Sequence, residues 1–268
     1  MIGRVLRLDW ELARRGFARY AAYPAATLAG LSTNIVFGFM RGSVLVAMFA
    51  LRADVGGYDV VATLTYVWLT QGLLNVVALW GWQELALRIR SGDIATDLIR
   101  PVHPIRAGLD LDLGRAAYHV LFRGIPPVLV GAIFFRVVLP ASPLVWLAFA
   151  ASVVLAVCVS FGFRVLYNLL AFWTGDSRGI TTIAITLASL FSGFIVPLGF
   201  SPDWLRTIAH ATPFPSMIQL PVDIFVGRAT GIDLAVTLIV QLAWAAVLLS
   251  TAGGLFAVGT RRLVVQGG

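Results

Sequence analysis

Lysine is absent from this chain of 268 residues, because all 20 of its basic residues are arginines. A phosphate-binding P-loop and Schiff-base chemistry both need a lysine amine, so both are excluded. Cysteine occurs once, at Cys158 within an apolar run, which excludes an intramolecular disulfide and a cysteine-based metal site. Neither an HExxH nor a GxSxG motif is present, and His103, His119 and His210 are far apart in the sequence. We therefore expect no enzyme, no cofactor bound by this chain and, where ATP is used, a separate ATPase.

Charged residues are also scarce. They make up 12% of the chain, whereas hydrophobic residues make up 59%. In a soluble domain of this size, about a quarter of all residues are charged. We therefore expect most of the surface of this chain to face lipid. The composition predicts an all-α membrane protein in which residues 1–268 form a single transmembrane domain.

Six long apolar runs cover most of the sequence, and each is about as long as the ~20 residues that cross a bilayer as a helix. We therefore predict six transmembrane helices. The run at 180–200 ends in GFIVPLGFSP, so it either crosses, bends or re-enters. The predicted spans are 24–51, 58–80, 118–139, 143–173, 180–200 and 231–259.

The arginines lie unevenly along the chain. Five precede the first run, five lie between the second and third runs, and two follow the last run. The segments that should face the other side of the membrane hold only four. This bias predicts that both termini are cytoplasmic. It also explains the net charge of +7 by attraction to anionic membrane lipid rather than to nucleic acid. In that order, the arginines are Arg4, Arg7, Arg14, Arg15, Arg19; Arg88, Arg90, Arg100, Arg106, Arg115; Arg261, Arg262; and Arg52, Arg136, Arg206, Arg228.

Two segments outside the runs are amphipathic or broken. Residues 3–20 place leucines on one face and arginines on the other, which favours a helix lying in the cytoplasmic interface, the alternative being an extension of the first span. Residues 201–230 are moderately apolar and rich in proline. Because prolines interrupt helices, we expect this outer segment to form short re-entrant half-helices or to cap a cavity.

A few polar residues fall inside the predicted spans. Arg164 is costly there and either lines a translocation path or pairs with a structural partner, whereas Arg41 and Arg123 are expected to reach an interface. Amides of three spans form a polar thread, which serves either hydrogen bonding between helices or substrate contact. The candidate path residues are Asn34, Gln71, Asn75, Arg164 and Asn168. We expect every Asp and Glu to lie at or outside the end of a span.

The segment GDIATDLIRPVHP lies within the polar stretch 83–117, which the arginine bias makes cytoplasmic. Ser91 can cap a helix that begins at Gly92. On this helix, Ile94, Leu98 and Ile99 fall on one side. Pro101 then ends the helix. A short rigid helix beneath the membrane suits docking to another protein. The residues of this predicted interface are Gly92, Asp93, Ile94, Asp97, Leu98, Arg100 and Pro101.

This segment resembles the G-D/E-I-x-x-x-L-x-R-P-V/L signature in the cytoplasmic loop of ABC-2 type transporter permeases. The resemblance extends to TNIVFGFMRG at 33–42, to residues 191–227 and to the C-terminal RRLVVQGG. It implies an exporter half with an interfacial helix, a coupling helix between spans 2 and 3 and a re-entrant segment between spans 5 and 6.

The resemblance further implies two copies of an ABC ATPase subunit that hold ATP and Mg²⁺, a second permease chain of the same or related sequence, and export across a bacterial inner membrane. The expected cargo is an amphipathic or lipophilic compound, such as an antibiotic, a drug or a lipid, moved by alternating access. The main alternative is a stand-alone secondary transporter or channel, which should carry acidic residues inside its spans. A membrane scaffold or assembly factor is a third alternative.

Overall fold

The computed structural model describes residues 2–49, 54–80, 83–174 and 178–262. The described chain is helical throughout, with only an isolated β-bridge between Val55 and Tyr58. Residues 50–51 of the first predicted span, Arg52 and residues 263–268 of the C-terminal motif lie outside the described ranges.

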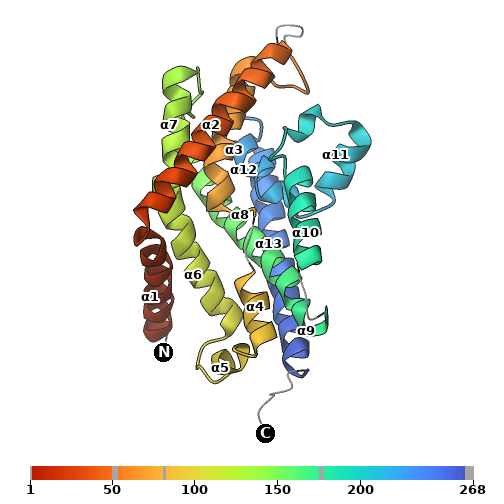
Figure 1. The fold of residues 1–268 in the computed structure, drawn as a ribbon. Coiled ribbons are helices and arrows are strands. Elements are labelled where there is room, and N and C mark those ends of the chain that lie inside the picture. Colours follow the sequence, from red (N-terminus) through yellow and green to blue (C-terminus); the bar gives the residue numbers. More distant parts are fainter. Residues whose placement is uncertain (1, 50–53, 81–82, 175–177, 263–268) are drawn as a thin grey trace.

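The helices run along one long axis of the molecule (Figure 1). Those of the first half are α1 (Ile2–Ala21), α2 (Pro24–Phe49), α3 (Val60–Val76), α4 (Glu84–Ser91), α5 (Ile94–Leu98), α6 (Pro104–His119), the π-helix η1 (Val120–Gly124) and α7 (Ile125–Phe134). Those of the second half are α8 (Pro143–Leu169), α9 (Ala171–Thr174), α10 (Arg178–Phe191), the 3₁₀ turn η2 (Leu198–Phe200), α11 (Asp203–His210), the 3₁₀ turn η3 (Phe214–Ser216), α12 (Gln219–Phe225) and α13 (Ile232–Thr260).

Proline sets where three of the long helices begin. Pro24, Pro104 and Pro143 each occupy the first position of a helix, where the missing N–H costs no hydrogen bond. The sequence placed Pro104 in the polar stretch 83–117, outside the predicted spans. Instead it opens α6, so residues 104–117 are helical and continue without a break into η1 and α7.

Four helical segments are long and apolar enough to cross a membrane: Pro24–Phe49, Pro104–Phe134, Pro143–Thr174 and Ile232–Thr260. Three of them agree with predicted spans, and the third predicted span, 118–139, begins 14 residues earlier than expected. The remaining two predicted spans contain shorter helices. α3 has 17 residues and α10 has 14, or about 26 Å and 21 Å at 1.5 Å per residue.

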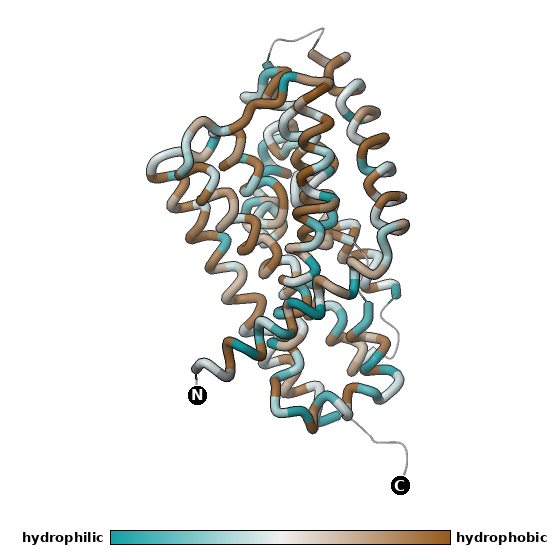
Figure 2. Tube along the Cα trace, turned by 90° about the vertical axis from the view of Figure 1, so that its left-hand side faces the viewer, coloured by the Kyte–Doolittle hydropathy of each residue, from teal (hydrophilic) through white to brown (hydrophobic). Residues whose placement is uncertain are grey.

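The apolar core lies around α8, which packs along α13 for most of its length and also contacts α3 and α12. A second apolar cluster joins α4, α5, α6, α8 and α13 nearer the end where α5 lies. Figure 2 shows mostly hydrophobic residues along the helices, with hydrophilic residues gathered on α1 and at the α5 end. The end of α13 lies at that same end of the molecule (Figure 1).

The proline-rich segment 201–230 forms two separate short helices. α11 is amphipathic and keeps Trp204 and Ile208 exposed, whereas α12 is almost fully buried against α8 and α3. Gln219 on α12 accepts a hydrogen bond from Tyr66 of α3 at 2.8 Å, and Asp223 accepts one from Tyr58 at 2.7 Å. Arg41 of α2 donates to the carbonyls of Phe194 and Ile195 just after α10, so it is held inside the protein instead of extending to an interface.

Candidate functional site

The turn between α4 and α5 depends on a glycine. Gly92 has φ of +79°, a left-handed conformation that glycine adopts without the strain of a Cβ, and its N–H bonds to the carbonyl of Ile89. Gly92 therefore ends α4. The prediction that Ser91 caps a helix starting at Gly92 is wrong: Ser91 is the last residue of α4, and its hydroxyl donates to the Asp93 carboxylate at 2.6 Å.

The apolar residues of this α4–α5 hairpin (residues 84–101) divide between the inside and the outside. Ile94 is fully buried in the cluster with Ile89, Ile105 and Phe161. The expectation that Ile94 fills a groove on a partner is therefore wrong, because its side chain holds the hairpin to the bundle. Outside, Leu98 is 43% exposed and Ile99 is 86% exposed.

An ion pair connects the two arms of the hairpin. Arg88 of α4 lies 2.6 Å from the carboxylate of Asp97 on α5, and Arg100 lies 3.5 Å from the same carboxylate. Asp97 is largely covered, whereas Arg100 is exposed. The pair fixes α5 relative to α4, and Pro101 follows as an exposed residue at the rim of a cavity.

The start of α4 is capped from another helix. Gln83, at the N-cap position, makes no side-chain cap, but the Oδ1 of Asn168 on α8 accepts from the N–H of Ala86 at 3.0 Å. Asn168 also donates to the carbonyl of Arg164, one turn earlier on α8, at 2.7 Å. Because free N–H groups at a helix start need an acceptor, Asn168 joins the hairpin to α8.

A buried ion cluster forms around Arg164, one turn before Asn168 on α8. Arg164 donates to Asp112 of α6 with Nη2 2.6 Å from Oδ2, and Arg115 donates to the same carboxylate with Nε 2.6 Å from Oδ1. All three side chains are at most 8% exposed. Arg164 therefore forms an ion pair whose partner is within this chain, and it also lines a cavity, so the two alternatives for Arg164 both stay open.

Asp112 corrects a further expectation. Every acidic residue was expected at or outside the end of a span, yet Asp112 is buried within the candidate span Pro104–Phe134. It is tolerated there because two guanidinium groups share its charge.

Arg115 also serves the end of α3. Its Nη1 donates to the carbonyl of Asn75 at 2.6 Å and its Nη2 to that of Val76 at 2.8 Å. The last carbonyls of a helix have no partner within that helix, so Arg115 allows the short α3 to end inside the protein. The cluster thereby connects α3, α6 and α8.

The predicted polar thread does not come together on one surface. Asn34 of α2 donates to the carbonyl of Gln71 on α3 at 3.0 Å and is buried there as a contact between helices, and the Gln71 side chain is also buried. Asn75 and Arg164 line a common cavity, whereas Asn168 lies at α4.

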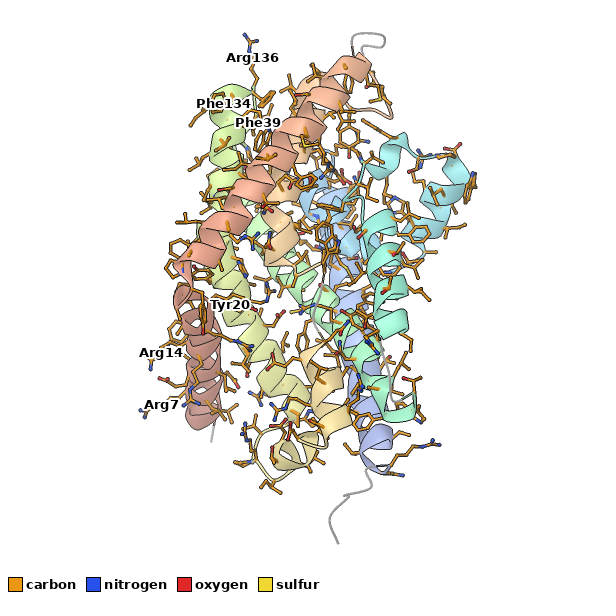
Figure 3. All side chains as sticks on the ribbon, in the orientation of Figure 1. Arg7, Arg14, Tyr20, Phe39, Phe134 and Arg136 are labelled. Atoms are coloured by element: carbon orange, nitrogen blue, oxygen red, sulfur yellow. The ribbon has the colours of Figure 1, made fainter. Side chains whose placement is uncertain are left out.

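A cavity of about 580 Å³ lies between α1, the hairpin, α6 and α8. Arg19 of α1 pairs with Glu84 of α4 at 3.1 Å, and Arg106 of α6 pairs with Asp9 of α1 at 2.6 Å across this region. The hydrogen bond to Glu84 raises the pKa of the Arg19 guanidinium. Figure 3 shows that Arg7 and Arg14, by contrast, point from α1 away from the bundle.

Sequence reasoning missed Asp112, Arg115 and the lining role of Arg123. A signal was available in DLDLGR at 110–115, where an acid and an arginine are three residues apart and would meet on one face of a helix. Assigning residues 104–117 to the polar stretch outside the predicted spans concealed it.

A model of the family described as ABC-2 family transporter protein matches residues 35–267. No curated protein matches the chain. The match covers the hairpin, the ion cluster and all four candidate spans except the first 11 residues of α2. This chain, a multi-pass membrane protein, therefore belongs to the ABC-2 family of transporter proteins.

Proposed function

We propose that this chain is the transmembrane permease subunit of an ATP-driven exporter that moves an amphipathic or lipophilic compound out of a bacterial cell by alternating access. Permeases of this family are transport components and generally work with an ABC ATPase. ATP and Mg²⁺ would be held by two copies of that ATPase, and a second permease chain would complete the translocation path.

α3 and α10 would then supply the two membrane segments that are shorter than a full span. α1 would lie near the cytoplasmic interface, and α11 and α12 would form the outer re-entrant segment.

The observation that carries the proposal is the exposed apolar surface of a braced hairpin. Leu98 and Ile99 are exposed on this hairpin, while Ile94 and the Arg88–Asp97 pair hold its backbone in place. Figure 1 shows α5 at the same end of the molecule as the end of α13. Exposed large apolar residues on a fixed helix are typical of a contact site for a partner protein.

A polar route leads from this hairpin into the bundle. Asn168 joins α4 to α8, Arg164 joins α8 to α6 through Asp112, and Arg115 joins α6 to the end of α3. A force that an ATPase applied to α5 would therefore reach α8, α6 and α3 through hydrogen bonds and ion pairs. Such a route supports alternating access, because it moves helices together rather than one at a time.

Aspartates at Leu98 and Ile99 test the partnership. We expect Leu98→Asp/Ile99→Asp to weaken binding of the ATPase at least about 30-fold, since truncating a central interface residue costs 2 kcal/mol or more. The affinity of the purified permease for its ATPase measures this. Val138→Asp/Leu139→Asp, two exposed neighbours beyond α7, is the matched control and should bind normally. Unchanged affinity in the hairpin variant would overturn the proposed interface.

Charge reversal tests the brace. Arg88→Asp or Asp97→Arg alone should weaken ATPase binding about fivefold, because a partly exposed ion pair contributes about 1 kcal/mol. The double variant Arg88→Asp/Asp97→Arg should regain most of that affinity. Equal affinity in all four proteins would show that the hairpin keeps its form without this pair.

Asp112 is the one observation that favours a stand-alone secondary transporter, because ion coupling needs an acidic residue inside the spans. Its two arginine partners make it a structural group instead. Transport into vesicles by this chain alone, without an ATPase, would reverse that preference.

A further inference from the structure

A second cavity, of about 290 Å³, lies at the elbow between α1 and α2. The ends of α1 and α3, the start of α2, the junction of α6 with η1, and Arg164 of α8 surround it. Its described lining consists of Tyr20, Tyr23, Ala26, Thr27, Leu74, Asn75, Ala78, Trp80, Arg115, His119, Arg123 and Arg164. Figure 3 shows Tyr20 at this elbow.

The lining has an excess of positive charge. Arg115, Arg123 and Arg164 contribute guanidinium groups, and none of the described lining residues is acidic. Asp112 pairs with both Arg115 and Arg164, but its single carboxylate neutralises only one of the three positive charges. Arg123 forms no ion pair or hydrogen bond within the part of the chain that the structure describes.

Three buried polar atoms at the cavity have no hydrogen-bond partner among the described residues: the Nε of Arg123, the Nδ1 of His119 and the Nδ2 of Asn75. Buried polar atoms in proteins are nearly always hydrogen-bonded, and each one left without a partner costs about 1–3 kcal/mol. All three belong to side chains that line one cavity, and the Nε of Arg123 and the Nδ2 of Asn75 are donors, so a ligand with acceptor atoms suits this cavity.

The backbone around Arg123 is shaped for this arrangement. Arg123 lies in the π-helix η1, just before Pro126 and Pro127, and π turns inside long helices are frequent at functional sites. Its guanidinium crosses α2 at Gly30, where an added Cβ would overlap it. Arg123 is therefore held toward the cavity and does not extend to an interface as the sequence suggested.

The rim of the cavity is aromatic. Tyr23 and Trp80 line it and are both exposed, and Leu28, which directly follows Thr27 near the start of α2, is exposed as well. Aromatic and aliphatic residues exposed on a membrane protein contact acyl chains. The cavity thus combines a cationic interior with an apolar rim.

From this combination we propose that the cavity binds the anionic head group of an amphiphile, a phosphate, sulfate or carboxylate, while the chain of the amphiphile lies against Tyr23 and Trp80. The ligand is the cargo, or a relative of it, if the proposed function holds. Arg123 is the main contact, and His119 and Asn75 complete the site. Arg115 and Arg164 are already engaged with Asp112 and add charge.

Lipid binding to the purified permease–ATPase complex tests the site. The probes are dioleoylphosphatidylglycerol, dioleoylphosphatidylcholine and glycerol phosphate, added in uncharged detergent, with binding followed by native mass spectrometry and by thermal unfolding. Phosphatidylglycerol should bind at least 10-fold more tightly than the other two probes. Equal binding of the two lipids would overturn the proposal. Glycerol phosphate that binds as tightly as phosphatidylglycerol would assign the site to a free anion and overturn the amphiphile.

Arg123→Gln should bring phosphatidylglycerol binding down to the level of phosphatidylcholine, and Arg123→Lys should keep part of the preference. Arg136→Gln removes the same charge from an exposed arginine beyond α7 (Figure 3) and should leave binding unchanged. Without lipid, Arg123→Gln should unfold at the same or a higher temperature than wild type, because it removes a half-buried charge that has no ion-pair partner among the described residues. A lower unfolding temperature together with a retained lipid preference would show a purely structural arginine.

The two proposals fail in different ways. A complex that forms normally but shows no lipid preference removes the head-group site and leaves the exporter subunit. A chain that prefers phosphatidylglycerol but binds no ATPase removes the exporter subunit and leaves the site.

Discussion

The substitution Asp112→Asn is expected to lower the free energy of unfolding by about 3–5 kcal/mol, the typical effect of removing one partner from a buried charge pair. Asp112→Asn leaves Arg115 and Arg164 facing each other with no carboxylate between them, both nearly inaccessible to water. The carbonyls of Asn75 and Val76 still accept from Arg115 in this variant. Thermal unfolding of the detergent-solubilised protein measures the loss.

Asp203→Asn is the matched control, since Asp203 is 90% exposed and its pair with Arg206 lies on the surface. It should change stability by less than about 1 kcal/mol. Asp112→Asn/Arg164→Gln should recover part of the stability, because the second change removes one of the two positive charges that the Asp112 carboxylate held together. A wild-type unfolding temperature for Asp112→Asn would refute the buried cluster.

The substitution Gly114→Leu is expected to detach α1 from α6. A Cβ at Gly114 would overlap the backbone carbonyl of Ala13, and a Cβ at Gly16 would overlap that of Leu111, so each helix presents a glycine to the backbone of the other. Neither backbone can move aside without separating the helices. Overpacking a side chain costs about 1–3 kcal/mol, and we expect Gly114→Leu to reach or exceed that range.

The measurement is thermal unfolding together with limited proteolysis at the α1–α2 elbow. Gly254→Leu is the control, because Gly254 is also inside a helix but has open space around it. It should be neutral or slightly stabilising, since leucine favours helix over glycine. Similar behaviour of the two variants would show that α1 is not held by this contact.

Apolar run length was enough to predict the class of protein and the bounds of α2, α8 and α13 to within a few residues. These helices cross a hydrophobic layer with few internal polar groups, so their composition determines them. The position of the hairpin was also predictable, because a charged segment between apolar runs has to lie outside them. The six-span topology and the side of the membrane remain predictions.

The ion cluster was not predictable in the same way. Asp112 and Arg164 are 52 residues apart, and nothing local shows that one neutralises the other. Charges in residues 104–117 placed this segment outside the predicted spans, although a helix that begins at Pro104 can bury such charges in pairs. Ile94 was assigned to the outer face for a related reason: helical spacing groups it with Leu98, but the short α5 turns one of them inward and the other outward.

The π turn at Val120–Gly124 has a consequence for chain length. A π turn contains one residue more than the α-helix would need at that place. Deleting a single residue from 120–124 would let α6 and α7 join as a regular α-helix, and the residues that remain within the former π turn would change their direction around the helix axis. In a shortened relative, an arginine aligned with Arg123 would then face a different neighbour although no side chain had been exchanged. The count of residues, as much as their identity, places this charge beside the elbow of α1 and α2.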